Sequence, residues 1–263
     1  MSRHSIKSFS TALFKKPFYA AFFNIVRLCE NPLDILVRYV FEVGDYPKQF
    51  FVTTPLGLQG VSVYSHADLI TFVECFGKLD YAAPEDISLV VDMGSNIGIS
   101  ALYFLTRNPN VKVYLFEPVP RNVERLRENL KGFENRYEVS ELAIGVREGQ
   151  ADFVCDATGR YGGLVEGGPS YLAQCPPERR IKVQAKPANR VLEEILNLHG
   201  QIDIVKIDVE GFENQILSHL EAGILSRIRR IYAETAVDRK MPGFSSERYG
   251  GLTRYYRTED SAD

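Results

Sequence analysis

From residue 88 onward the apolar residues gather in short continuous runs, and segments of helical length with one apolar side separate them. Such runs are typical of parallel strands that are buried on both faces. The predicted strands are residues 89–92, 111–116, 137–140, 202–208 and 228–234. The predicted helices are residues 98–106, 121–130, 189–198 and 213–220. The order β-α-β-α-β, an insertion and then β-α-β predicts an α/β fold, a Rossmann-like sheet with helices on both faces.

The first 80 residues carry a different pattern. Residues 50–54 and 58–64 are rich in Val, Phe, Tyr and Thr and flank Pro55-Leu56-Gly57, which predicts a β-hairpin. A helix is expected over 67–76 and an amphipathic helix over the apolar stretch 18–28. We therefore expect an N-terminal helical and hairpin extension at 1–80 and a ligand-binding domain at 81–263.

Two regions of the second part are less regular. Small strands are predicted at 151–155 and 181–185, and the glycine-rich segment 158–177 between them is interpreted as a loop. After residue 234 only 29 residues remain, and 243–263 is polar with little strand pattern. Either a short hairpin around Gly250-Gly251 closes the sheet, or the chain is abbreviated and completes itself by association.

Composition narrows the classes of function. A chain of 263 residues is long enough for one large domain with smaller additional elements, and too short for two large domains. The net charge of -3 gives no general attraction to phosphate backbones, which argues against a nucleic-acid partner. The four cysteines form no CxxC pair and no His lies at zinc spacing, so a cytoplasmic protein without a disulfide framework or structural metal is expected.

The strongest local signal is the segment LVVDMGSNIGIS at 89–100, a buried strand that ends in Asp92 and a glycine turn before a helix. Gly94 can take a tight turn, Gly98 lets the helix approach closely, and the helix N-terminus offers amides to an anion. The next predicted strand is followed by Glu117, 25 residues after Asp92, near the spacing of acids that bind ribose hydroxyls. This pattern predicts a site for a nucleoside.

The spacing of the glycines indicates which nucleoside-containing ligand the site binds. GxxxG replaces the GxGxxG of pyrophosphate sites, and no GK[ST] is present for a triphosphate. S-adenosylmethionine fits better, because it has a ribose diol, a carboxylate for the turn amides, and positive groups that favour nearby acids such as Asp92.

The segments VVDMGSNIGISA, FEPVPRN and VKIDVEGFE resemble the signatures of the FkbM family of S-adenosylmethionine-dependent methyltransferases, a class I fold, over roughly residues 50–235. Named members methylate hydroxyls of macrolides, sugars and glycolipids. The resemblance implies that the turn holds the methionine and adenosine portions and that Glu117 holds the ribose. By analogy with related folds, Glu141 to Ala143, at the end of the third strand, is expected to lie against adenine. The turn residues are Asp92, Gly94, Asn96 and Gly98, and Ser95 between them is included in the candidate site.

Methylation of an alcohol requires a base or a cation beside the methyl group. Lys206, Asp208 and Glu210 occupy alternate positions of an apolar strand and would point to one side. Asp208 is the main catalytic candidate, and Glu234 at the end of the next strand is another. Lys206 could instead form an ion pair with Asp208 or Glu234, and Glu210 or Glu213 could cap the following helix. Asp208, Glu210 and Glu234 could also hold Mg²⁺.

Three further features concern the acceptor and its surroundings. Among four histidines only His66 could reach the mouth of the site, and Tyr161 lies in a glycine-bearing loop suited to acceptor binding. Lys15 and Lys16 flank an aromatic face of Phe14, Phe18, Phe22 and Phe23, which fits either packing on the domain or contact with a membrane surface.

We therefore expect O-methylation of a sugar or glycoconjugate, with a macrolide or polyketide hydroxyl as the alternative. An oxidoreductase is disfavoured by the missing GxGxxG, and base-amine methylation by Asp208-Val209-Glu210-Gly211 where [DN]PP[FYW] would stand. A binding protein without catalysis has the same fold and is the third class.

Overall fold

The computed structural model describes residues 16–155, 162–235 and 239–258, with side chains from residue 19 onward. The chain divides into two compact units, Met1–Ala82 and Ala83–Asp263. Within the described ranges, no helix combines the length and the apolar character needed to cross a membrane.

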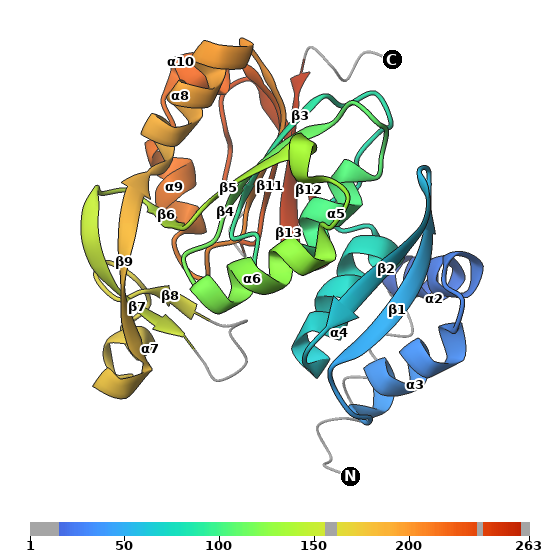
Figure 1. The fold of residues 1–263 in the computed structure, drawn as a ribbon. Coiled ribbons are helices and arrows are strands. Elements are labelled where there is room, and N and C mark those ends of the chain that lie inside the picture. The colour runs from blue at the N-terminus through green and yellow to red at the C-terminus, as the bar shows by residue number, and fades with distance from the viewer. Residues whose placement is uncertain (1–15, 156–161, 236–238, 259–263) are drawn as a thin grey trace. The chain divides into compact units, whose positions relative to one another are not determined.

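A seven-stranded sheet forms the centre of the second unit (Figure 1). Its order is β12-β13-β11-β10-β3-β4-β5, and β3, β4, β5, β10 and β11 run parallel. The strands are β3 (Leu89–Met93), β4 (Lys112–Phe116), β5 (Tyr137–Ser140), β10 (Ile202–Ile207), β11 (Ile228–Ala233), β12 (Phe244–Tyr249) and β13 (Leu252–Arg257). The chain moves outward from β3 in one direction and returns on the other side at β10. This reversal is where Rossmann-like sheets bind ligands, outside the carboxyl ends of the strands.

The parallel strands occur where the continuous apolar runs predicted them. All five residues of β3 are buried, including Asp92. The register places Lys206 of β10 beside Asp92, and Leu115 of β4 on its other side. The prediction of a Rossmann-like α/β sheet is confirmed, and strand ends differ from the predicted ones by no more than one residue.

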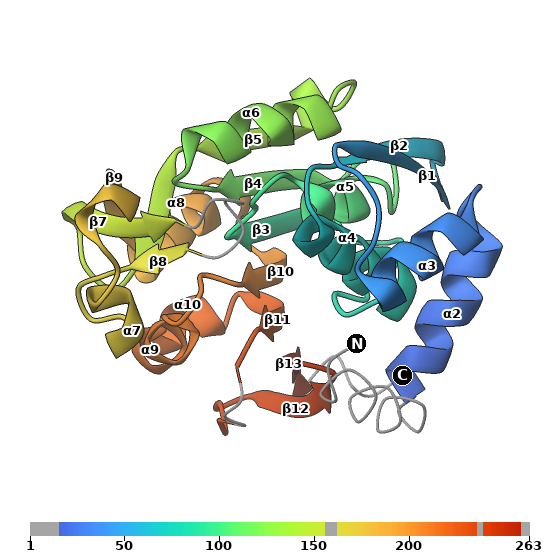
Figure 2. The same cartoon turned by 90° about the horizontal axis from the view of Figure 1, so that it is seen from below.

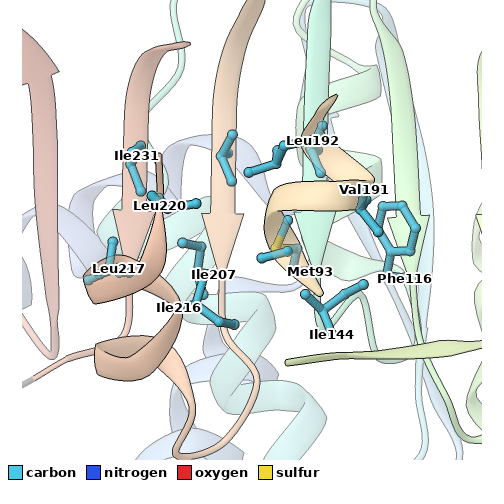
Figure 3. Close-up of a cluster of buried hydrophobic side chains, with 14 of the residues drawn as sticks. Met93, Phe116, Ile144, Val191, Leu192, Ile207, Ile216, Leu217, Leu220 and Ile231 are labelled. Atoms are coloured by element: carbon cyan, nitrogen blue, oxygen red, sulfur yellow. The ribbon is translucent and has the colours of Figure 1, made fainter. Parts of the chain in front are cut away.

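Helices cover both faces of this sheet. They are α5 (Ile99–Leu105), α6 (Pro120–Asn129), α8 (Ala188–His199), α9 (Glu213–His219) and α10 (Ala222–Leu225). Residues of α8 and α9, such as Leu192 and Ile216, pack with Met93 and Ile207 in one buried cluster (Figure 3). Seen from below, α5 lies on the opposite face (Figure 2), and Gly98 before it approaches Leu126 of α6.

A second sheet lies in the insertion between β5 and β10. Its order is β6-β9-β7-β8. The strands are β6 (Leu142–Gly145), β7 (Gly149–Cys155), β8 (Gly162–Leu164) and β9 (Arg180–Pro187). Single helical turns lie at α7 (Ser170–Ala173) and η3 (Pro177–Arg179), and a further turn, η2 (Glu134–Arg136), precedes β5. The interpretation of 158–177 as a loop is therefore wrong where β8 and α7 form. Strand β8 is stabilised by hydrogen bonds to β7, and the hydrophobic pattern of its own three residues does not predict this pairing.

The C-terminal residues complete the large sheet. Strands β12 and β13 form an antiparallel hairpin, and β13 pairs with β11. Tyr249 and Leu252 close the hairpin around Gly250-Gly251, and Gly250 has a φ of 61°. Of the two alternatives for this end, the structure has the hairpin.

The first unit contains the expected hairpin and helices. Its elements are α2 (Lys16–Leu28), α3 (Pro32–Phe41), β1 (Lys48–Thr54), β2 (Gly57–Val63), α4 (His66–Phe72) and the wider π-helical turn η1 (Val73–Lys78). The rings of Phe50, Phe72 and Phe76 form a row in its core, with centroids 6.0 and 5.2 Å apart. Ser65 caps α4 by accepting the amide of Asp68, whose carboxylate accepts the amide of Tyr64. Helix α3 was not predicted.

The turn after β3 is pressed against the segment after β10. Gly94 has a φ of 82°, and a Cβ placed on it would lie 1.8 Å from the carbonyl oxygen of Asp208. The amide of Asp208 donates to the carbonyl of Met93 at 3.0 Å. Only glycine fits here, for reasons of both backbone conformation and space.

We predict that Gly94→Ala lowers the free energy of unfolding by at least about 3 kcal/mol, because the left-handed conformation and the clash add together. Gly132→Ala is the matched control: its φ is 94°, but no atom lies within 4 Å of the added Cβ. The control should lose only about 1 kcal/mol. Urea unfolding of both variants measures the difference, and equal losses would contradict the close approach.

Candidate functional site

A buried network of charges joins the ends of β3 and β10. The Nζ of Lys206 lies 2.9 Å from Oδ1 of Asp92 and donates to the carbonyl oxygen of Gly94, also at 2.9 Å. Ser100 donates its hydroxyl to the other oxygen of Asp92 at 2.6 Å. Lys206 and Asp92 are 2% and 0% exposed, so this pair is shielded from water. Such a pair is retained only when its remaining hydrogen-bonding capacity is used, as it is here.

Lys206 also reaches Asp208. The distance from its Nζ to Oδ2 of Asp208 is 3.4 Å, and the side chain of Asp208 is 24% exposed. Of the roles considered for Lys206, the structure shows an ion pair, with Asp92 as the main partner and Asp208 as a second. The amino group therefore fixes the turn and the partly exposed carboxylate relative to each other.

Glu117 follows β4 and lies beside the same turn. Its Oε2 accepts the amide of Asn96 at 3.0 Å, and its Oε1 accepts the amide of Val119 and the side-chain amide of Asn122. A carboxylate has about four acceptor positions, so one remains for a ligand. Burial raises the pKa of Glu117 to about 7, although these hydrogen bonds act in the opposite direction.

The turn amides are used within the protein. Those of Gly94 and Ser95 both donate to the carbonyl of Phe116, and that of Gly98 donates to Ser95. The expectation that the turn amides would be free for a ligand carboxylate is wrong for these residues. The side-chain oxygen of Asn96 is different, because it is buried and has no hydrogen-bond partner. This oxygen is suited to accept from a positively charged ammonium group.

Three acidic residues follow the ends of β10 and β11. Glu210 is partly exposed and has a φ of 56°, and Glu234 is exposed. Glu213 is buried, and its carboxylate accepts the amides of Val209 and Gly211. Of the two residues considered for capping α9, Glu213 therefore holds the loop before the helix.

The structure gives no support to a metal site at these acids. Among the described residues, no group of three or more His, Cys, Asp or Glu side chains is arranged to hold a metal ion. Binding of Mg²⁺ by Asp208, Glu210 and Glu234 stays a prediction.

The residues expected beside adenine follow β5. Glu141 is exposed and forms an ion pair with Arg127 at 3.6 Å. Ala143 lies in β6, is 4% exposed and belongs to the buried cluster. Their contact with adenine stays a prediction.

Both residues expected to bind the acceptor stay predictions. His66 begins α4 of the first unit and stays a prediction. Tyr161 lies outside the described residues.

Three contributors were missed by the sequence. Ser100 donates a hydrogen bond to Asp92, and Asn122 donates one to Glu117. Both are polar residues inside the motif segments to which no role was given, and that position could have identified them. Tyr171 gave no signal, because its neighbours Pro169 and Leu172 approach the loop after β10 only through the packing of Gly211 and Gly163.

The second sheet meets the loop after β10 through glycines. A Cβ on Gly163 of β8 would lie 2.9 Å from the carbonyl oxygen of Glu210 and 2.8 Å from the side chain of Leu172. A Cβ on Gly211 would lie 2.5 Å from Pro169. Main chain therefore packs directly on this loop, and Tyr171, which is 58% exposed, lies in the chain between Pro169 and Leu172, the two residues of these contacts.

The order of the strands, the glycine turn and the acid after β4 define a Rossmann-like class I methyltransferase fold. Residues 92–247 match the methyltransferase FkbM domain, which is more than half of the chain. The chain belongs to the FkbM methyltransferase family, as the resemblance of its motifs indicated.

Curated relatives are distant. The 2-O-methyltransferase NoeI of Sinorhizobium fredii is 29% identical over 155 residues, which cover 56% of this chain and 62% of that protein. The 31-O-demethyl-FK506 methyltransferase FkbM of Streptomyces tacrolimicus is 26% identical over 174 residues, which cover 57% and 65%. The AMB antimetabolite synthetase AmbE of Pseudomonas aeruginosa is 27% identical over 212 residues, 70% of this chain and 10% of that protein. The chain thus spans less than two thirds of each of these relatives.

Among solved structures, methyltransferase FkbM from Methylobacillus flagellatus is 14% identical, with a TM-score of 0.39. The alignment covers 73% of this chain and 53% of that one.

The pKa of Glu117 predicts a pH dependence of stability. Its pKa is about 7 in the folded chain and near 4.5 when unfolded, so the folded state holds the proton more tightly. This group therefore leaves stability unchanged below pH 4.5 and lowers it as the pH rises from 4.5 to 7. The loss is about 3 kcal/mol at most.

We test this prediction with Glu117→Gln, which stays neutral at every pH. The free energy of unfolding of the ligand-free wild-type protein, measured by urea titration from pH 4.5 to 8, should fall relative to that of the variant. Parallel profiles would show that the carboxyl titrates normally.

Proposed function

We propose that this protein transfers a methyl group from S-adenosylmethionine to a hydroxyl oxygen of a sugar or glycoconjugate. The observation that carries the proposal is the FkbM domain match, whose residues include the turn after β3, Glu117 and Asp208 at the point where the strand order reverses. A partly exposed carboxylate at that point is suited to act on a bound acceptor.

The residues around the turn fit the cofactor. Glu117 keeps one acceptor position, which a ribose hydroxyl would use, and the buried oxygen of Asn96 would accept from the ammonium of the methionine part. When bound there, S-adenosylmethionine supplies a methyl group on a positively charged sulfur. Asp92 contributes indirectly, because both of its oxygens are already bonded to Lys206 and Ser100.

Asp208 is the residue placed to take the proton of the acceptor hydroxyl. Its carboxylate is partly exposed, while Lys206 holds one of its oxygens from the buried side. The carboxylate of Asp208 would accept the proton of the acceptor hydroxyl, and S-adenosylmethionine would supply the methyl group that takes its place on the oxygen. Lys206 is then a positioning residue, and Glu210 and Glu234 are further candidates to orient the acceptor.

Tyr171 and Glu210 support a sugar as the acceptor. Partial burial raises the pKa of the Tyr171 phenol, with smaller contributions from Glu210 and Glu213, and Gly163 packs against both Leu172, the next residue, and the carbonyl of Glu210. An exposed ring beside a carboxylate suits a sugar, since the ring covers the C–H face and the carboxylate accepts from hydroxyls.

A macrolide or polyketide hydroxyl is the second candidate. The relative from Streptomyces tacrolimicus carries a name that specifies 31-O-demethyl-FK506 as its substrate.

We predict that Asp208→Ala and Glu117→Ala abolish methyl transfer by different routes. Asp208→Ala should lower kcat at least about 100-fold, because a general base contributes 10²–10⁴-fold, and should leave the Kd for S-adenosylmethionine within about threefold. Glu117→Ala should raise this Kd at least about tenfold, because it removes a charged hydrogen bond and the support of Asn96.

Calorimetry with S-adenosylmethionine and transfer of a labelled methyl group separate the two effects. Glu247→Gln is the control, since Glu247 is 55% exposed on β12 and lies outside the site. Full turnover together with unchanged cofactor binding in both alanine variants would discard this assignment.

We predict that the Tyr171 ring, and not its hydroxyl, binds the acceptor. The assay uses a methyl glycoside, chosen from a panel, that the wild-type enzyme accepts as a substrate. Tyr171→Ala should lower kcat/KM for this substrate about tenfold, because stacking contributes about 0.5–1.5 kcal/mol. Tyr171→Phe keeps the ring and should stay within about threefold of wild type. Leu198→Ala is the control, because Leu198 is 75% exposed on α8. Equal activity of the alanine and phenylalanine variants would exclude stacking.

A further inference from the structure

Helix α2 of the first unit carries an apolar stripe on its exposed side. The stripe consists of Tyr19, Phe22, Phe23 and Val26, which are 53%, 50%, 66% and 48% exposed. Their positions follow the i, i+3, i+4, i+7 spacing of a single helix face. The rings of Phe22 and Phe23 meet edge to face with centroids 5.8 Å apart, so both present aromatic surface to the outside.

The other side of α2 already makes the contacts that hold the helix in its unit. Ala21 and Ile25 are buried and lie against Gly77 of η1. Asn24 donates its side-chain amide to the carbonyl of Gly77 at 2.8 Å. The exposed stripe is therefore additional to the core of this unit, and four large apolar side chains on one exposed face indicate an interaction surface.

Charge identifies the class of partner. The first 29 residues contain five basic side chains and no acidic one: Arg3, Lys7, Lys15, Lys16 and Arg27. The whole chain has a net charge of -3, so the remaining residues carry -8. Arg27 is exposed and lies one position after Val26, at the edge of the stripe. Positive charge concentrated in the same stretch of sequence as an aromatic helix face complements a negatively charged lipid surface.

We propose that α2 docks this protein on anionic membranes, with the stripe at the boundary between headgroups and acyl chains. The helix has 13 residues, about 20 Å of length, and would lie in the plane of the surface. Apolar burial and attraction of the basic residues act together, which is the combination that reversible surface binding requires. The exposed Leu33, Val37 and Phe41 of α3 are excluded from this surface, because Asp34 and Glu42 accompany them.

Co-flotation of the full chain with vesicles tests this proposal. Vesicles of phosphatidylcholine with one quarter phosphatidylserine should carry the protein, and vesicles of phosphatidylcholine alone should carry at least about tenfold less. Raising the salt concentration to 0.5 M should reduce binding to the anionic vesicles, because it screens the basic residues. Arg27→Gln should weaken binding about fivefold.

Phe22→Ser/Phe23→Ser should weaken binding at least about tenfold, since it removes apolar surface from the lipid contact. Leu58→Ser is the matched control: Leu58 is 50% exposed in β2 of the same unit and should leave binding unchanged. Circular dichroism and thermal unfolding of both variants should match the wild-type protein, because the replaced side chains lie outside the core.

Absence of binding to both kinds of vesicle would overturn the proposal, as would equal binding to neutral and anionic vesicles. Sedimentation equilibrium supplies a separate outcome. If the wild-type chain dimerises and Phe22→Ser/Phe23→Ser abolishes the dimer without changing vesicle binding, the stripe binds a second copy of this chain and the lipid assignment is wrong.

Discussion

The amino group of Lys206 is the contact on which the site depends. It bonds a buried carboxylate on β3, the carbonyl at the glycine turn and a partly exposed carboxylate after β10. Parallel strands bring these groups together only in one register, with Lys206 beside Asp92. A charged side chain in a dry sheet is unfavourable without such partners, so the same bonds that satisfy Lys206 also fix the turn and Asp208 relative to each other.

The sequence predicted the large sheet well because its signals are local. Continuous apolar runs mark β3, β4, β10 and β11, and Gly94 marks the turn at which β3 ends. The strands of the insertion are short and depend on one another. A three-residue strand such as β8 exists because β7 offers its edge, and no periodicity within three residues can show this.

The sequence predicted that the candidate residues lie close together, and it predicted the hydrogen bonds and ion pairs among them less well. Asp92, Glu117 and Asp208 meet at one edge of the sheet, as parallel strand ends must. Which atom bonds which depends on register and turn geometry. The carbonyl of Phe116 takes two turn amides, and Asp92 instead of Glu234 pairs closely with Lys206. Spacing along the chain carries no information on either choice.

The glycine contacts of the second sheet determine which substitutions the loop after β10 tolerates. Gly163 and Gly211 let main chain rest on main chain and on Pro169, so the junction between the insertion and the loop after β10 depends little on the identity of neighbouring side chains. An exposed side chain such as Tyr171 can therefore be replaced without removing these main-chain contacts, so the loop after β10 keeps its position while the outer surface changes.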